Sequence, residues 1–449
     1  MDRYYLPEIF THTMDGLDLK NHIVATYYMK DRLEGEKFIE HFSLIQALAL
    51  EGSTGTWEKV EEDTADVRIK LSGKMVGYFE IPNQEDPYTK EAVVQLAFPI
   101  DAWIDNVPMM LLSIAGNCFA YSSKMRLVDV FFPPNMLKNF KGPKFGVQGL
   151  RELTGVKDRP LSLHIIKPKM GMTPEQVANQ VYQTAMGGVD MCKDDEMTSD
   201  VYNSSYLDRI KAVNPMLEKA EAKTGKRVIY FCSITHEPSE LVKRARKAVA
   251  EGARGLLICY SAGLPALREV AEDPKVNVPI LLHASHMIAA QPRIAWPVFA
   301  KLCRICGADM MLTPTYWSSI PMVSMEEGLR TAQVKLAPLA HIRQTFPMPC
   351  AGVYPGLAPI LVGEYGTDIV IPAGGGMLGH PDGYTAGARA WQQGIAAAMS
   401  GENIIEFAKK PENRELRRAI EKWGVIDRPK TPWLRVAPQF HPHKMKFDA

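Results

Sequence analysis

The sequence lacks an excess of charge of either sign, a long apolar run and a paired set of cysteines. Lys and Arg number 52 against 51 Asp and Glu, for a formal net charge of +1, which argues against nucleic acid or an acidic membrane as a partner. The longest nearly uncharged apolar run, residues 107–116, is far below the roughly 20 residues that span a bilayer. The amino terminus, MDRYYLPEIF, has neither the basic start nor the apolar core of a signal peptide. We therefore expect a cytoplasmic protein with no nucleic-acid and no membrane partner.

The seven cysteines are an odd number and are scattered through apolar segments, as expected for buried thiols in a reducing compartment. Cys303 and Cys306 form one CxxC pair, and no second pair completes a zinc site. We interpret this pair as one face of a helix. At 449 residues the chain is too long for one ordinary core, so at least two domains are expected.

From about Pro160 the sequence repeats an apolar segment, a polar loop and an amphipathic stretch of helical length. Thr173 as N-cap and Gln176 form the capping box that starts the first of these helices, and Pro174 stands at its first position. There are eight apolar segments, at residues 161–169, 187–195, 226–234, 252–261, 278–286, 308–315, 346–353 and 368–376. Eight such alternations predict an α/β protein whose residues 146–449 form a (β/α)8 TIM barrel, with a terminal helix and a proline-rich tail.

The first 145 residues lack this rhythm. They combine strand-like pieces, at residues 66–81 and 92–100, with helical ones. We predict a separate α+β (ferredoxin-like) domain over residues 1–145.

Unusual polar residues stand where the predicted barrel strands end, which is where barrel enzymes hold their catalytic groups. The pattern involves four strands. The first ends in Lys167 and Lys169, the second in Lys193, Asp195 and Glu196, the fifth in His283 and His286, and the eighth in Gly374, Gly375 and Gly376.

The segment Lys193–Glu196 sets one lysine beside three carboxylates. Side chains alternate along a strand, so Lys193 and Asp195 point the same way, and Glu196 joins them only if the chain turns. Two carboxylates suit a hard cation such as Mg²⁺, which a protonated lysine would repel. A lysine that has taken up CO2 becomes a carbamate, which is a third anionic oxygen ligand. A solvated turn after the strand is the alternative.

The glycines that follow the eighth strand, with Gly352 after the seventh, stand at the usual phosphate position of a barrel. Glycine lets backbone N–H groups approach a phosphate closely. A flexible loop is the alternative interpretation.

Together these segments resemble the large subunit of ribulose-bisphosphate carboxylase/oxygenase (RuBisCO). The resemblance rests on the motifs EGSTGTW (51–57), SIAGNCF (113–119), FKGPKFGVQGLRE (140–152), IIKPKMGMTPE (165–175), GGVDMCKDDE (187–196) and AGGGMLGHP (373–381). It implies that Lys193 is carbamylated and binds Mg²⁺ with Asp195 and Glu196. It further implies that Lys167 is an acid/base lysine tuned by Lys169.

The resemblance also implies one phosphate site and a shared active site. The residues that would bind the phosphate are Thr56, Trp57, Gly352, Gly374 and Gly375. Glu51 and Asn117 would reach into the barrel of a partner subunit, so the minimal active unit would be a homodimer, alone or within a higher oligomer.

Several departures from RuBisCO decide the expected function. RuBisCO carries a lysine in a mobile loop after the sixth strand, whereas this chain has no lysine between Lys301 and Lys335. Leu312 and Cys350 replace a histidine and a serine of the second phosphate site. The chain is therefore identified as a RuBisCO-like protein that does not fix CO2. We expect His286, Tyr316 and Trp317 to line a pocket for an uncharged or carboxylate-bearing substrate tail.

We expect a Mg²⁺-dependent lyase or isomerase that forms an enediolate from a monophosphorylated keto sugar or keto sugar acid. The favoured reaction is that of a 3-oxo-isoapionate 4-phosphate decarboxylase, because loss of CO2 from a β-keto acid gives an enediolate that Lys167 can protonate. The alternative is a 2,3-diketo-5-methylthiopentyl-1-phosphate enolase or related isomerase of methionine salvage, against which the intact KPK segment counts. A non-catalytic regulatory scaffold is a further alternative, and the complete metal and lysine set argues against it.

Overall fold

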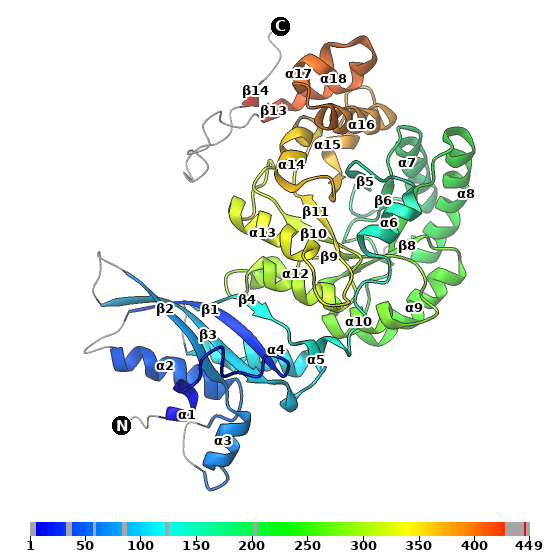
Figure 1. The fold of residues 1–449 in the computed structure, drawn as a ribbon. Helices are drawn as coiled ribbons and strands as arrows, with labels where there is room; N and C mark the ends of the chain where they lie inside the picture. Colours follow the sequence, from blue (N-terminus) through cyan, green and yellow to red (C-terminus); the bar gives the residue numbers. More distant parts are fainter. Residues whose placement is uncertain are drawn as a thin grey trace. The chain divides into compact units, whose positions relative to one another are not determined.

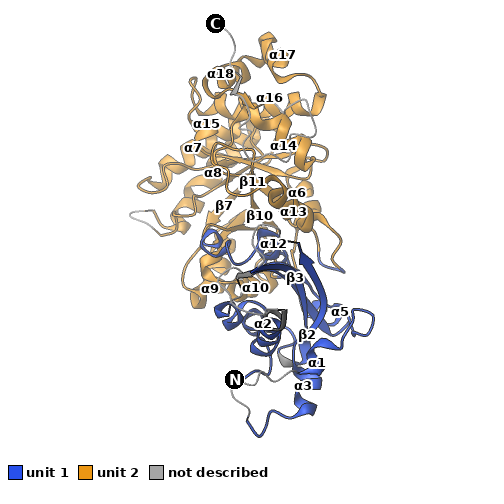
Figure 2. Ribbon diagram, turned by 90° about the vertical axis from the view of Figure 1, so that its left-hand side faces the viewer, with its two compact units in different colours: residues 1–141, 286–305, 340–342 blue, residues 142–285, 306–339, 343–449 orange. Residues whose placement is uncertain are grey.

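A computed structural model describes residues 6–32, 38–56, 60–82, 88–121, 125–200, 204–426 and 444–445 of the chain. The chain divides into two compact units (Figure 2). The first comprises residues 1–141, 286–305 and 340–342, and the second comprises residues 142–285, 306–339 and 343–449.

The first unit is built on a four-stranded antiparallel sheet with the strand order β2-β3-β1-β4 (Figure 1). Its elements are α1 (Pro7–Phe10), β1 (His22–Arg32), α2 (Phe38–Glu51), α3 (Ala65–Leu71), β2 (Lys74–Ile81), β3 (Thr89–Pro99), α4 (Val107–Ala115), β4 (Arg126–Phe131), α5 (Pro134–Leu137), α11 (Met287–Ala290) and α12 (Trp296–Ile305). A helical connection follows β1 and another follows β3, so the order β-α-β-β-α-β confirms the predicted ferredoxin-like arrangement.

One predicted strand piece in this unit, residues 66–81, is confirmed over residues 74–81 and wrong over its first part. Residues 66–71 belong to α3, because the hydroxyl of Thr64 accepts a hydrogen bond from Val67 N at 3.3 Å and caps the helix. The strand begins only at Lys74.

The second unit is the predicted barrel of parallel strands (Figure 1). Its strands are β5 (Leu161–Ile165), β6 (Met191–Lys193), β7 (Ile229–Ser233), β8 (Gly255–Cys259), β9 (Ile280–His283), β10 (Met310–Pro314), β11 (Phe346–Cys350) and β12 (Val370–Ala373). Each lies within one of the eight predicted apolar segments. The strands pair in sequence order, and β12 pairs with β5. Between β11 and β12 the described residues lie side by side without ladder pairing, so the barrel is nearly closed.

Helices of the second unit follow the strands along the chain. They are α6 (Gly146–Thr154), α7 (Pro174–Met186), α8 (Tyr206–Thr224), α9 (Pro238–Ala250), α10 (Leu264–Glu272), α13 (Met325–Leu336), α14 (Ala358–Tyr365), α15 (Gly375–Leu378), α16 (Tyr384–Ser400), α17 (Ile404–Lys409) and α18 (Arg414–Trp423). The predicted capping box of α7 is present, with Thr173 and Gln176 bonding each other's backbone groups.

The amino end of the barrel is closed by α6. Its side chains Val147 and Leu150 are buried in one cluster with inward residues of the strands, among them Leu163 and Met310. The entry to α6 is tied to the barrel where Phe145 N and Gly146 N donate to Asp309, which directly precedes β10. The polar groups lie at the opposite end of the barrel, where the strands finish.

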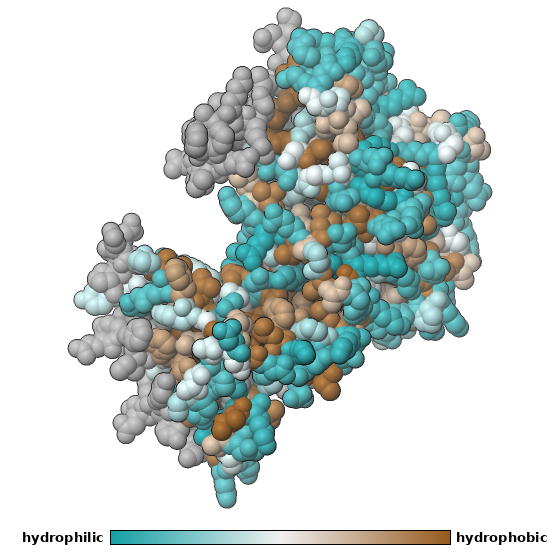
Figure 3. Space-filling view, in the orientation of Figure 1, coloured by the Kyte–Doolittle hydropathy of each residue, from teal (hydrophilic) through white to brown (hydrophobic). Residues whose placement is uncertain are grey.

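The terminal helix predicted near the end of the chain is α18, and its surroundings are mostly hydrophilic at the surface (Figure 3). Most of the predicted tail lies outside the described residues, although β14 (Lys444–Met445) pairs with β13 (Val425–Ile426). All seven cysteines are buried and none forms a disulfide, as expected. Within the described ranges, no helix combines the length and apolar character needed to cross a membrane.

Candidate active site

The polar strand ends of the second unit bring six of the predicted residues together. Lys167 and Lys169 follow β5, Lys193 ends β6 with Asp195 and Glu196 directly after it, and His283 ends β9. Ile165 lies opposite Lys193 in the ladder between β5 and β6. The carboxyl ends of neighbouring parallel strands therefore position these side chains at one rim, as the sequence predicted.

Each of the two carboxylates contacts a lysine of the KPK segment. Lys167 Nζ donates to Asp195 Oδ2. Lys169 Nζ donates to Glu196 Oε1 at 2.7 Å and lies 3.7 Å from Asp195 Oδ1. Asp195 is fully buried and Glu196 half-buried. The two acids and two bases thus form one cluster rather than separate solvated charges, which argues against the solvated-turn interpretation.

The protonation of Glu196 and its neighbours follows from this cluster. Burial opposes ionisation of Glu196, but nearby positive charge and the hydrogen bond from Lys169 outweigh it and hold the pKa of Glu196 below its usual range. The hydrogen bond to Glu196 in turn raises the pKa of Lys169. Burial lowers the pKa of His283 to about 3, so its imidazole is neutral at pH 7. His283 Nε2 lies 3.4 Å from Glu196 Oε2.

Lys193 is fully buried at the end of β6. Its Nζ donates to the carbonyl oxygen of Asp194 at 2.9 Å. Burial lowers the pKa of Lys193, and the charge of Lys167 adds to this effect, while Glu196 and Asp195 oppose it. A lowered pKa enlarges the fraction of neutral amine. The neutral amine is the form that reacts with CO2.

The donor set at this rim fits Mg²⁺ once a third ligand is supplied. No three His, Cys, Asp or Glu side chains converge as a metal site in the part of the chain that the structure describes. Asp195 and Glu196 provide two carboxylates, and a carbamate on Lys193 would add a third hard oxygen donor, which is the ligand type Mg²⁺ prefers. In addition, His283 Nδ1 is buried and has no hydrogen-bond partner among the described residues. A polar atom left without a partner at this position is suited to a ligand.

The glycines predicted to hold phosphate have different surroundings. A Cβ atom on Gly374 would lie 3.1 Å from Lys167 Cε, so this glycine leaves room for the lysine side chain. A Cβ on Gly375 would meet nothing within 4 Å, so Gly375 faces open space. Phosphate binding by these residues stays a prediction.

Gly352 has a packing role that the sequence did not predict. Its φ is +70°, and a Cβ there would lie 1.9 Å from Ser319 Oγ. Ser319 donates to the carbonyl oxygen of Gly352 from its N at 3.2 Å and from its Oγ at 2.9 Å. The loop after β10 is thus attached to the loop after β11.

The remaining predicted residues are placed as follows. Glu51 accepts a hydrogen bond from Tyr121 OH at 3.1 Å in the first unit. Asn117 begins a short 3-10 helix there, and Thr56 is exposed. Trp57 lies outside the described residues. Their approach to a partner's barrel stays a prediction.

The three residues of the predicted tail pocket belong to different units. Tyr316 and Trp317 belong to the second unit, with ring centroids 5.2 Å apart and planes at 86°. Trp317 is buried, and its Nε1 has no partner among the described residues. His286 belongs to the first unit. A common pocket for the three stays a prediction.

Two groups that the sequence did not predict hold the rim residues in place through hydrogen bonds outside the rim itself. Gln180 on α7 holds both backbone groups of Lys167, accepting from Lys167 N at 3.1 Å and donating to its carbonyl oxygen at 2.8 Å. Asp194 contacts Arg209 and Tyr230 inside the barrel wall. The alternation of side chains within KDDE signalled that Asp194 faces away from the rim.

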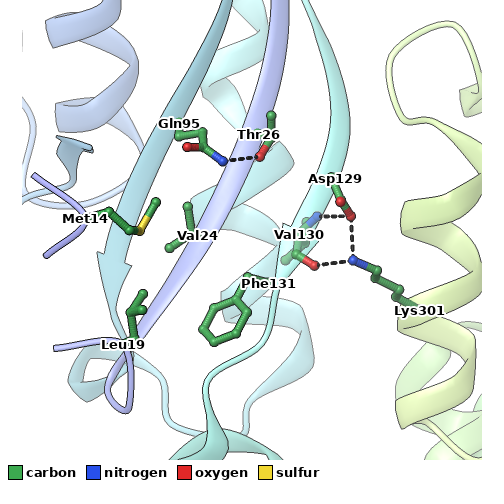
Figure 4. Close-up of a pocket in the computed structure, with 9 residues that line it drawn as sticks. All are labelled: Met14, Leu19, Val24, Thr26, Gln95, Asp129, Val130, Phe131 and Lys301. Atoms are coloured by element: carbon green, nitrogen blue, oxygen red, sulfur yellow. Dashed lines mark hydrogen bonds and ion pairs between the residues drawn. The ribbon is translucent and has the colours of Figure 1, made fainter. Parts of the chain in front are cut away.

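The first unit holds a pocket of about 320 Å³ that contains none of the predicted site residues (Figure 4). Its polar groups pair with one another, since Gln95 donates to Thr26 at 3.3 Å and Lys301 to Asp129 at 2.5 Å. The rest of its lining is mainly apolar, with Val24 and Phe131 at the sheet.

The chain combines a ferredoxin-like sheet with a barrel, and the carboxyl ends of the barrel strands bring lysines together with two carboxylates. This combination defines the class of RuBisCO large chains. Two family models match the chain. The model of the ribulose bisphosphate carboxylase large chain N-terminal domain matches residues 16–136, and that of its catalytic domain matches residues 146–423. The chain therefore belongs to the RuBisCO large-chain family.

Individual relatives cover nearly the whole chain. A ribulose bisphosphate carboxylase-like protein of Archaeoglobus fulgidus is 36% identical over 422 residues, covering 91% of this chain and 94% of that protein. A 2,3-diketo-5-methylthiopentyl-1-phosphate enolase of Geobacillus thermodenitrificans is 33% identical over 417 residues, covering 90% and 98%. The dimeric archaeal RuBisCO of Hyperthermus butylicus superimposes with a TM-score of 0.81 at 31% identity, covering 93% of this chain and 99% of that one.

Proposed function

We propose that this RuBisCO-like chain is a Mg²⁺-dependent enzyme that forms an enediolate from a monophosphorylated keto compound. The observation that carries the proposal is Lys193, a fully buried lysine with a lowered pKa beside Asp195 and Glu196. Lys193 as its carbamate, Asp195 and Glu196 would hold the ion. A Mg²⁺ ion bound there would polarise two neighbouring oxygens of a keto substrate and so make an adjacent C–H bond more acidic.

The residues around the ion would bind the substrate and move protons. Lys167, whose side chain is 34% exposed while its partner Asp195 is buried, reaches from the rim and would exchange a proton with the reacting carbon. The neutral His283, with Nδ1 unpaired among the described residues, would hydrogen-bond a substrate oxygen. Gly375 faces open space and would admit the phosphate.

The loop after β10 supports a function other than carboxylation. Residues 315–324 contain no lysine. Ser319 is bonded to Gly352, and Tyr365 OH donates to Thr315 Oγ1 at 2.9 Å. A loop tied at two points and lacking the lysine has no cationic side chain to polarise CO2.

Two reactions share the proposed intermediate. Enolisation of a phosphorylated diketone is supported by the 33% identity to the Geobacillus enolase. Decarboxylation of a β-keto acid of the 3-oxo-isoapionate 4-phosphate type, the reaction favoured from the sequence, is supported by the contact of Lys167 with Asp195, which orients a proton donor toward the rim. We place enolisation first because a full-length relative carries that name.

The test follows proton exchange and products separately. The purified protein with Mg²⁺ and bicarbonate would be incubated in D2O with each substrate, and ¹H NMR would report deuterium uptake next to the carbonyl. CO2 release and the ³¹P spectrum identify the product. Lys193→Met, which keeps the side-chain length without the amine, is the control. Exchange with the diketone that is lost in this variant supports the enolase, and CO2 release from the keto acid supports the decarboxylase. A wild type silent with both, in exchange and in product, contradicts the proposal.

We also propose a homodimer as the active form, with Glu51 and Asn117 completing the partner's site. The dimeric state of the Hyperthermus butylicus relative supports this. Light scattering on the purified protein measures the state directly.

A further inference from the structure

The residue between the proposed metal ligands, Asp194, faces into the barrel wall. It is fully buried. Its Oδ1 accepts from Tyr230 OH at 2.6 Å, and its Oδ2 accepts from Ser233 N at 2.8 Å, both on the neighbouring strand β7. Because side chains alternate along a strand, these bonds fix the side of the strand on which Lys193 and Asp195 point.

Arg209, on α8, completes this group and is also fully buried. Its Nε lies 3.1 Å and its Nη2 3.0 Å from Asp194 Oδ2. Its Nη1 donates to the carbonyl oxygens of Ser199, at 2.6 Å, and Ser204. One guanidinium therefore joins the end of β6, the start of α8 and both sides of the loop between them.

A buried ion pair is a costly way to stabilise a fold, since apolar residues of similar volume often serve as well. Its advantage is directional: the fork of a guanidinium fixes the positions of several acceptors at once. Outer groups that orient metal ligands in this manner contribute to metal affinity.

We infer that Asp194, Arg209 and Tyr230 form a positioning network for the proposed Mg²⁺ site. The network holds the backbone of residues 193–196 so that Lys193, Asp195 and Glu196 face one point. This inference rests on the proposed function and adds the residues that set the affinity of the site.

The other end of β6 supplies a matched control. Asp190 is fully buried and accepts from Arg159 Nη2 at 2.8 Å and Nη1 at 2.9 Å, from Lys226 Nζ at 2.7 Å and from Ser162 N at 2.7 Å. This group has the same chemistry on the same strand, but it lies at the amino end, roughly 13 Å from Asp194 at 3.3 Å per residue. Changes in the ion-pair group around Asp190 should therefore affect stability and not Mg²⁺ affinity.

The experiment compares Tyr230→Phe, which removes one hydroxyl, and Arg209→Lys with the control Arg159→Lys. Mg²⁺ affinity is measured by calorimetry in the presence of bicarbonate, carbamate by ¹³C NMR with labelled bicarbonate, and stability by urea unfolding. We expect Arg209→Lys to weaken Mg²⁺ binding about 10- to 100-fold, and Tyr230→Phe less, as for other outer groups of metal sites. Arg159→Lys should lower stability and leave Mg²⁺ affinity within about twofold of wild type, which is less than any outer-group effect.

Two outcomes overturn the inference in different ways. If Arg209→Lys and Tyr230→Phe lose stability as Arg159→Lys does while keeping wild-type Mg²⁺ affinity, the network is purely structural and the proposed function stands. If the wild type itself shows neither a carbamate signal nor bicarbonate-dependent Mg²⁺ binding, the proposed function fails and the inference fails with it.

Discussion

Gly352→Ala tests whether the loop after β10 is held in place by this glycine. A Cβ at this position would meet Ser319 Oγ at 1.9 Å and Ser319 Cβ at 3.2 Å. A left-handed φ costs a non-glycine residue roughly 1–2 kcal/mol. Moving Ser319 away removes two hydrogen bonds of about 1 kcal/mol each. We therefore expect a loss of about 3–4 kcal/mol, the sum of these terms, in the free energy of unfolding.

The matched variant is Ser319→Ala, which removes the clashing Oγ and keeps its Cβ. Ser319→Ala alone should cost about 1 kcal/mol, for one hydrogen bond. In the double variant residue 319 need not move, so only the φ cost and the hydrogen bond of the Oγ are lost, about 2–3 kcal/mol. A double-mutant cycle should therefore give a coupling energy of about 2 kcal/mol between the two positions. Urea unfolding followed by tryptophan fluorescence measures all four proteins. A coupling energy near zero would refute the proposed contact.

The affinity of these variants for inorganic phosphate distinguishes the packing role of Gly352 from its predicted role in phosphate binding. If packing alone matters, phosphate affinity measured by calorimetry recovers in the double variant, in which residue 319 no longer has to move. If Gly352 also binds phosphate through its backbone, affinity stays low in the double variant.

Three further predictions concern other parts of the chain. Mixing separately inactive Glu51→Gln and Lys193→Met variants should restore up to about a quarter of wild-type activity through mixed dimers that hold one intact site, if subunits share sites; no recovery after confirmed subunit exchange argues against a shared site. Gln180→Leu should lower kcat more than it raises KM, because Gln180 orients the backbone of Lys167; a change in KM alone, or normal kinetics, contradicts this role. Burial raises the pKa of Asp309 to about 6 from an ordinary 3.8, so this group contributes stability below about pH 4 that is lost as pH rises through about 6. Asp309→Asn should flatten the dependence of the free energy of unfolding on pH in this range. It should also lower that free energy by about 1–3 kcal/mol, since an amide leaves a backbone N–H of Phe145, Gly146 or Ile280 without an acceptor. An unchanged pH dependence, measured by urea unfolding, would exclude Asp309 as its source.

The barrel and its rim were predictable because their signals are local. Each strand is a short apolar segment between turn residues, and the polar groups directly follow the segment that ends. Lys167, Lys193 and Asp195 therefore meet wherever neighbouring parallel strands end at the same edge. The capping box at Thr173 is likewise encoded within four residues.

Most of the features that the sequence did not predict depend on partners distant along the chain. Ser319 and Gly352 are 33 positions apart, and Asp194 and Arg209 are 15 apart. In neither pair does the sequence around one residue indicate the other as its partner. The piece at residues 66–71 has strand-like composition, but the cap supplied by Thr64 favours a helix.

The closure of the barrel by α6 has a consequence for the evolution of this scaffold. The seal occupies the amino ends of the strands, and the lysines and carboxylates occupy the carboxyl ends, so changes among these polar residues leave the apolar cluster under α6 untouched. A lineage can then lose a loop lysine, exchange its substrate and acquire another reaction while the sealed core stays as it was. The reactive carboxyl end of the barrel can therefore change in evolution while the sealed amino end stays the same.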